Sequence, residues 1–136
     1  MPIAHTTLLV SDLAASKAFY TTALAPLGYI VALEFPGTVG FGTPLGIDFW
    51  LKDTEGVKVP RIHLAFAGTS EKQVDGFHAA ALTMRGNEAD AGAYRKAGAT
   101  CNGPPGLRPQ YAPNYYGGFV KDLDGHNMEC VHFKPE

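Results

Sequence analysis

The chain has 136 residues, of which 46% are hydrophobic and 18% are charged, and its formal net charge is −2. This length and apolar content are typical of one folded domain and exclude a disordered chain. Because 11 basic residues are balanced by 13 acidic ones, the sequence lacks the basic face of nucleic-acid-binding proteins and gives no reason to expect a membrane partner.

The sequence also lacks the usual signals for export or membrane insertion. No apolar run is long enough to cross a membrane, and the N-terminus has neither the basic region nor the apolar core of a secretory signal. The two cysteines, Cys101 and Cys130, form no CxxC pair and are too few for a disulfide framework. We therefore expect a cytoplasmic protein.

Residues 1–57 predict a strand, a helix and three further strands. The first strand covers residues 3–10, and Ser11 or Asp12 then supplies an oxygen that can cap a helix. The apolar face of this helix consists of Leu13, Phe19, Tyr20, Ala23 and Leu24. Short strands follow over residues 27–35, 39–42 and 46–52, separated by Pro36-Gly37 and Pro44.

Residues 58–136 predict the same order of elements. A strand over residues 61–67 leads to Ser70 and Gln73, which form a capping-box pattern before a helix. The apolar face of that helix consists of Val74, Phe77, Ala81 and Leu82. Strands over residues 100–101, 116–121 and 127–133 follow, with a D-L-D-G turn at 122–125. Residues 86–98 predict a lengthened helical connection, and residues 102–113 a loop ordered by its prolines.

The two halves match each other without gaps at a shift of 58 positions, which carries His5 onto His63. The other matched pairs are Pro2 with Pro60, Ser11 with Thr69, Phe19 with Phe77, Ala23 with Ala81 and Leu24 with Leu82. These positions are a strand opener, a helix cap and a helix face, so the match indicates an internal repeat. The sequence therefore predicts an α+β fold: a single domain over residues 1–136 that contains two βαβββ modules related by a pseudo-twofold axis.

Two histidines at equivalent places on equivalent strands are the main chemical signal. If the first strands of the modules lie side by side, His5 and His63 face each other. Glu129 lies in the middle of an otherwise apolar strand, where a carboxylate faces either solvent or a partner. Each group alone is more often structural, but two imidazoles and a carboxylate suit a divalent metal and leave open positions for substrate. We therefore predict His5, His63 and Glu129 as ligands of one divalent metal ion.

A carboxylate in the first module would complete the symmetry of this site. Asp48 aligns with Glu129 if a shorter turn absorbs a gap of three residues, and Trp50 is the alternative of the same strand parity. Asp48 is therefore a candidate fourth ligand or substrate-binding group.

Aromatic and basic residues can line a pocket beside the metal. Walls are predicted from Phe35, Phe41, Phe49 and Trp50, and hydroxyls from Tyr111, Tyr115 and Tyr116. The alternative is that most of the phenylalanines belong to the core. Tyr115 and Tyr116 point to opposite faces of a strand, so at most one of them faces the site. Arg108 can pair with an anionic substrate or remain a solvated loop charge. The other histidines, His78, His126 and His132, are expected to be partly exposed or on the surface.

Two segments of the sequence resemble the vicinal-oxygen-chelate superfamily, which includes glyoxalase I, bleomycin-resistance proteins and extradiol dioxygenases. Residues 10–20 (VSDLAASKAFY) are similar to its opening strand and helix, and residues 119–129 (FVKDLDGHNME) to its closing hairpin. The resemblance implies a curved, barrel-like sheet around a cleft, and it maps the metal ligands onto His5, His63 and Glu129. It also implies a homodimer, with the site built within one chain or shared across two.

The resemblance implies that the metal (Zn, Ni, Fe, Mn or Co) chelates a small substrate through neighbouring oxygens and acts as a Lewis acid. A metal-dependent lyase or isomerase, with Glu129 or Asp48 as base, is the first hypothesis. A non-catalytic protein that sequesters a small molecule, as resistance proteins of the superfamily do, is the second. Ring-cleaving dioxygenase activity is disfavoured, because Phe119 replaces the signature tyrosine and no histidine lies between Leu107 and Gly118.

Overall fold

The computed structural model describes residues 3–83 and 99–135. The first module consists of β1 (Thr6–Val10), α1 (Leu13–Ala23), the short 3-10 helix η1 (Ala25–Leu27), β2 (Ile30–Phe35), β3 (Thr38–Thr43) and β4 (Gly46–Asp53). The second consists of β5 (His63–Ala67), α2 (Glu71–Thr83), β6 (Thr100–Leu107), β7 (Tyr115–Lys121) and β8 (Asn127–Phe133). Within the described residues, no helix is long and apolar enough to cross a membrane.

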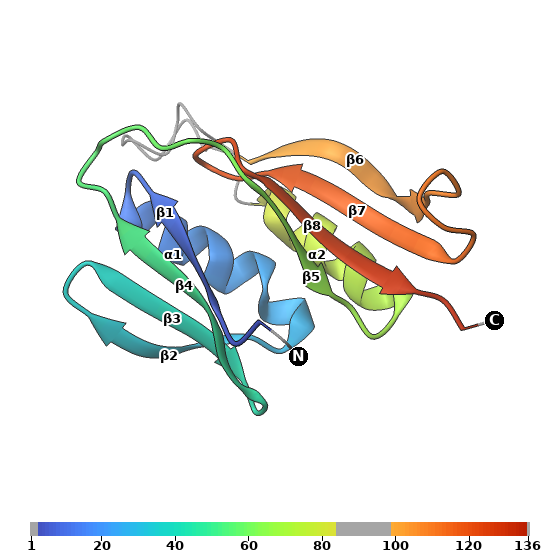
Figure 1. Cartoon of the computed structure of the whole chain (residues 1–136), viewed down its shortest axis with the longest axis horizontal. Helices are drawn as coiled ribbons and strands as arrows, with labels where there is room; N and C mark the ends of the chain where they lie inside the picture. The colour runs from blue at the N-terminus through green and yellow to red at the C-terminus, as the bar shows by residue number, and fades with distance from the viewer. Residues whose placement is uncertain (1–2, 84–98, 136) are drawn as a thin grey trace.

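Each module forms a four-stranded sheet with the same topology, in the order β1-β4-β3-β2 and β5-β8-β7-β6. The first strand of each module pairs in parallel with the last, and the remaining pairs are antiparallel. In Figure 1 the sheets lie next to each other, β1 and β5 run in opposite directions at the seam, and both helices lie behind the sheets. The predicted α+β fold of two βαβββ modules is therefore confirmed.

One hydrophobic core lies between the helices and the sheets and extends across both modules. The helix faces expected from the sequence pack into the core, with Phe19, Tyr20 and Phe77 fully buried and Leu13 and Leu82 partly buried. Phe49 of β4 lies edge-on to Tyr20 at 5.0 Å between ring centres and to Phe66 of β5 at 5.1 Å. Aromatic edge contacts of this kind therefore connect the two modules.

The predicted helix starts are confirmed in detail. Asp12 is the N-cap of α1, because its carboxylate accepts a hydrogen bond from the Ala15 amide at 3.0 Å. The Ser70 hydroxyl accepts from the Gln73 amide at 3.2 Å, and the Gln73 side chain accepts from the Thr69 amide at 2.8 Å. The bonds to the Ala15 and Gln73 amides satisfy groups that a helix start leaves without partners, and the bond from the Thr69 amide fixes the residue that precedes the cap.

Two predicted element boundaries were wrong. Residues 102–107, expected in a loop, belong to β6. Pro104 and Pro105 have no amide N–H to donate, and a strand tolerates them here because β6 is at the edge of its sheet and pairs on one side only. The first strand begins at Thr6, so His5 precedes it instead of lying within it. The predicted helical connection over residues 86–98 lies outside the described residues.

His126, expected on the surface, is buried with 1% of its area exposed. Its Nδ1 accepts a hydrogen bond from the Ile62 amide at 3.0 Å, so its Nε2 carries the proton and donates to the Leu9 carbonyl at 3.1 Å. The ring therefore joins β1 to the segment that leads into β5. His132 is partly exposed, as expected, and its Nδ1 lies 3.1 Å from the Gly68 carbonyl oxygen.

The two cysteines differ in exposure, which predicts a difference in reactivity. Cys101 is exposed, whereas burial raises the pKa of the Cys130 thiol to about 12 from its usual 9.0. At neutral pH this shift keeps the Cys130 thiol protonated and therefore unreactive. A thiol reagent should therefore modify one cysteine rapidly in the folded protein and the second only on unfolding. Cys101→Ser should abolish the rapid phase, and two rapid phases in the wild type would contradict the buried position of Cys130.

Candidate functional site

The sheet of the second module buries one face against α2 and leaves the other open. Pairing places Ala65 of β5, Glu129 of β8 and Phe119 of β7 in one row across this sheet. His63 and Tyr115 lie two and four residues away from members of this row on their own strands, so they share its face. The open face of the second module therefore gathers His63, Glu129, Tyr115 and Phe119.

Glu129 is the buried centre of this group, with 1% of its area exposed. Its Oε2 lies 2.8 Å from His63 Nε2, and its Oε1 accepts a short hydrogen bond from the Tyr115 hydroxyl. The His63 side chain is 54% exposed. Both carboxylate oxygens have partners, which offsets the cost of burying the charge, and the imidazole lies between the carboxylate and solvent.

The Tyr115 hydroxyl keeps its proton at physiological pH. Burial raises its pKa, the hydrogen bond to Glu129 and the negative charge of Glu129 raise it further, and the positive charge of Arg108 opposes the rise. The rings of Tyr111 and Phe133 flank the Tyr115 ring, with ring centres at 5.2 and 5.3 Å. Tyr115 is therefore a positioned hydrogen-bond donor to Glu129.

Arg108 also reaches this face. Its Cζ lies 5.5 Å from the centre of the Phe119 ring, and the same ring lies 6.2 Å from the His63 ring. Phe119 is therefore a common neighbour of the histidine and the guanidinium.

Tyr116, also predicted to bind substrate, lies on the other face of β7. Its hydroxyl donates to Asp75 of α2 at 2.7 Å, and this hydrogen bond, with smaller effects of burial and charge, raises its pKa to about 12. At most one of the two adjacent tyrosines was expected to face the site, and the one that does is Tyr115.

In the first module, strand register makes Trp50 the counterpart of Glu129. Leu8 of β1 pairs with Leu51 of β4, and Phe66, which is equivalent to Leu8 in the repeat, pairs with Cys130 of β8. Leu51 and Cys130 are therefore equivalent, and so are the residues directly before them, Trp50 and Glu129. Trp50 therefore takes the place of Glu129, and the alignment of Asp48 with Glu129 was wrong. Asp48 is the extra residue where the β3–β4 register shifts, and its carboxylate accepts a hydrogen bond from the Tyr29 hydroxyl at 3.1 Å.

The open face of the first module is apolar instead of acidic. Trp50 stacks on Phe35 with ring centres 6.3 Å apart, and a Cβ at Gly40 would lie 2.7 Å from the indole. Leu9 and Leu33 are 42% and 45% exposed. Of the predicted pocket walls, Trp50 and Phe35 lie on this face. The other two, Phe41 and Phe49, are buried in the core.

The three predicted metal ligands are not brought together within one chain. His63 and Glu129 are in contact, whereas His5 is exposed before the start of β1. His126 contacts both Leu9, near the end of β1, and Ile62, just before β5. The end of β1 therefore lies beside the start of β5. Because the two strands run in opposite directions, His5 lies far from the start of β5. In residues 3–83 and 99–135, no three His, Cys, Asp or Glu side chains are grouped closely enough to hold a metal ion.

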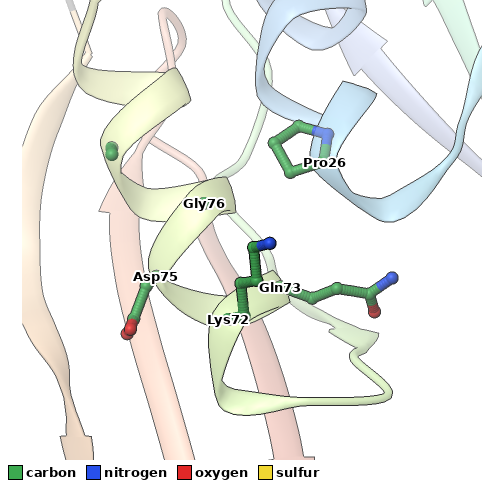
Figure 2. A pocket seen from close by; sticks show the side chains of 6 residues that line it. Pro26, Lys72, Gln73, Asp75 and Gly76 are labelled. Carbon is green, nitrogen blue, oxygen red and sulfur yellow. The ribbon is translucent and has the colours of Figure 1, made fainter.

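A hollow of about 470 Å³ lies away from this cluster, on the helix side of the molecule. Figure 2 shows Pro26 of η1 facing Gly76 of α2 across it, and a Cβ at Gly76 would come within 3.0 Å of Pro26. The remaining lining comes from Lys72, Gln73, Asp75 and Ala79. Because this lining contains no histidine or cysteine and only one carboxylate, the hollow is not a candidate metal site.

The model of the Glyoxalase/Bleomycin resistance protein/Dioxygenase superfamily matches residues 2–130. A glyoxalase/bleomycin resistance protein from Albidiferax ferrireducens T118 is 27% identical, with a TM-score of 0.75 over 99% of this chain and 100% of that chain. A protein of the same description, also termed a dioxygenase, from Nocardioides is 25% identical, with a TM-score of 0.59 over 96% and 82%. The lactoylglutathione lyase from Agrobacterium tumefaciens shares the fold at 19% identity, with a TM-score of 0.63 over 96% and 92%. No curated protein matches the chain.

Proposed function

The chain belongs to the Glyoxalase/Bleomycin resistance protein/Dioxygenase superfamily, and we propose that it is a divalent-metal-dependent lyase or isomerase of the glyoxalase type, acting on a small oxygenated substrate. The observation that carries this proposal is the buried Glu129, held against the exposed His63 on an open sheet face. A purely structural carboxylate on that face would be expected at the surface, where it needs no partner.

His63 and Glu129 fit a borderline divalent ion such as Zn, Ni, Fe, Mn or Co, because an imidazole nitrogen and a carboxylate oxygen already converge. When bound, the metal would supply Lewis acidity to neighbouring oxygens of the substrate. The Tyr115 hydroxyl fixes the orientation of Glu129, as hydrogen bonds to ligating carboxylates do in metal sites. With its carboxylate held in this way, Glu129 can accept a proton from a bound substrate.

The third ligand in this proposal comes from a second copy of the chain. His5 is exposed and remote from His63 and Glu129 in its own chain. The open face of the first module carries partly exposed apolar side chains, including Phe35 at 57% and Leu9 at 42%, as is typical of interaction surfaces. In a twofold dimer this face would lie against the second module of the partner, and each site would combine His5 of one copy with His63 and Glu129 of the other. We place this homodimer in the cytoplasm, where the free thiols of Cys101 and Cys130 stay reduced.

Metal binding tests the proposal directly. We expect the wild type to take up one Zn²⁺ or Ni²⁺ per chain in calorimetric titrations, and Glu129→Ala or His63→Ala to lower the affinity about 100-fold or more. Asp48→Ala is the matched control, because this exposed carboxylate lies outside the cluster, and it should bind like the wild type. No metal uptake by the wild type after reconstitution, with the fold verified by circular dichroism, would refute the proposal.

Sequestration of a small molecule without catalysis is the second candidate function. It is favoured by the aromatic pair Trp50 and Phe35 on the open face of the first module. Trp50 stands where the second module has Glu129, so this module has an apolar surface in place of a metal ligand. A thermal-shift screen separates the two functions. Stabilisation by aromatic compounds but by no divalent metal would favour sequestration.

A further inference from the structure

Arg108 follows β6 directly and folds back over the sheet instead of extending into solvent. Its Nη2 donates to the Pro104 carbonyl at 2.5 Å and its Nη1 to the Leu107 carbonyl at 3.4 Å. The guanidinium lies over the Phe119 ring, with Cζ 5.5 Å from the ring centre. Backbone carbonyls and an aromatic face thus hold its position.

Two glycines on β6 make room for this placement. A Cβ at Gly103 would lie 3.3 Å from Arg108 Nη2 and 3.1 Å from Phe119, and a Cβ at Gly106 would lie 3.1 Å from Arg108 Nη1. Gly103 has a φ of 151°, in a region that favours glycine. The strand therefore presents no side chains where the guanidinium crosses it.

Arg108 has no acidic partner in residues 3–83 and 99–135, where the ion pairs involve Lys17, His63 and Lys134. The guanidinium has five N–H donors in a planar fork, and two of its hydrogen bonds go to carbonyls. A half-buried guanidinium that has donors to spare and forms no ion pair within the described part of the chain suits a planar oxyanion.

These observations rest on and extend the proposed function, because Phe119 is the neighbour of both Arg108 and His63. We propose that Arg108 forms an anion subsite, so that the substrate carries a carboxylate in addition to the two oxygens that would chelate the metal. The metal end then selects vicinal oxygens, and Arg108 selects the charge.

Two catechols, one with a carboxylate and one neutral, test the subsite: 3,4-dihydroxybenzoate and 4-methylcatechol. Both offer vicinal oxygens, and only the first has a carboxylate across the ring. With the zinc-loaded protein, calorimetry should give a Kd about tenfold lower for 3,4-dihydroxybenzoate than for 4-methylcatechol. In Arg108→Gln this advantage should fall to less than about twofold, with 4-methylcatechol binding unchanged.

Three further variants sharpen the test. Lys72→Gln removes the same charge from the helix side of the molecule and should leave the advantage intact. Lys121→Gln removes an exposed cation at the end of β7 and should also retain it. Gly106→Ala places a methyl group against Arg108 Nη1 and should reduce the advantage without any change of charge.

The outcomes separate this inference from the proposed function. If both catechols bind equally to the wild type, or the advantage survives in Arg108→Gln, the anion subsite is refuted and metal chelation stands. If neither catechol binds in a zinc-dependent way, the proposed function fails. Benzoate, which has no vicinal oxygens, then reports on Arg108 alone: weaker binding to Arg108→Gln than to the wild type supports the subsite, and equal or no binding overturns it.

Discussion

A mixture of His5→Ala and Glu129→Ala chains is expected to regain metal binding that neither variant has alone. If each site combines His5 of one copy with His63 and Glu129 of the other, a dimer with one chain of each kind has one intact site and one that lacks both groups. Random exchange makes half of the dimers mixed, so about a quarter of the wild-type metal content should return.

The measurement is metal content after the two variants are unfolded, mixed, refolded and separated from free metal. A mixture of His63→Ala and Glu129→Ala is the matched control, because both groups come from the second module. In every dimer of that mixture both sites lack a ligand, so no metal should return. If the first mixture also fails to regain metal, the three ligands do not come from two copies, and the shared site is excluded even if the wild type binds metal.

The repeat in the sequence predicted most of what positions this site. A shift of 58 residues superposed a strand, a helix cap and a helix face, and the two sheets have identical strand orders. Strand alternation likewise separated Tyr115 from Tyr116, because neighbouring residues on a strand point to opposite faces. The repeat of elements and the alternation of side chains along a strand depend only on the order of residues, so they can be predicted from the sequence alone.

The errors concern features that depend on how strands and modules meet. The shift in the β3–β4 register adds a residue at Asp48, so counting along the chain aligned the wrong residue with Glu129, whereas the pairing with β1 identifies Trp50. His126 is polar and follows a turn, which is typical of the surface, yet its partners lie on β1 and before β5. No local pattern in the sequence contains those contacts.

The position of Arg108 shows the same limit at the site itself. The sequence showed an arginine in a segment rich in glycine and proline, and it left both a substrate-binding group and a solvated loop charge open as interpretations. Only the folded strand shows that Gly103 and Gly106 open a path for the guanidinium onto Phe119. A glycine in an edge strand can therefore belong to the site as much as the side chain that it admits.

Replacement of Asp122 by alanine is expected to cause the largest loss of stability, about 3–5 kcal/mol in the free energy of unfolding, because it leaves three buried hydrogen-bond donors without their acceptor. The Asp122 side chain is 3% exposed. Its Oδ1 accepts from the Asp124 amide at 3.0 Å and the His126 amide at 2.8 Å, and its Oδ2 accepts from the Tyr20 hydroxyl. The network thus joins the turn before β8 to α1 of the other module.

Urea denaturation of the metal-free protein measures this effect without involving the site. Tyr20→Phe removes one of the three donors and should cost about 1 kcal/mol. Tyr116→Phe removes the same hydroxyl from a hydrogen bond near the surface and should change stability by less than about 0.5 kcal/mol. Equal effects of the two tyrosine variants would contradict the buried network. A near-neutral Asp122→Ala would mean that the turn before β8 does not hold the two modules together.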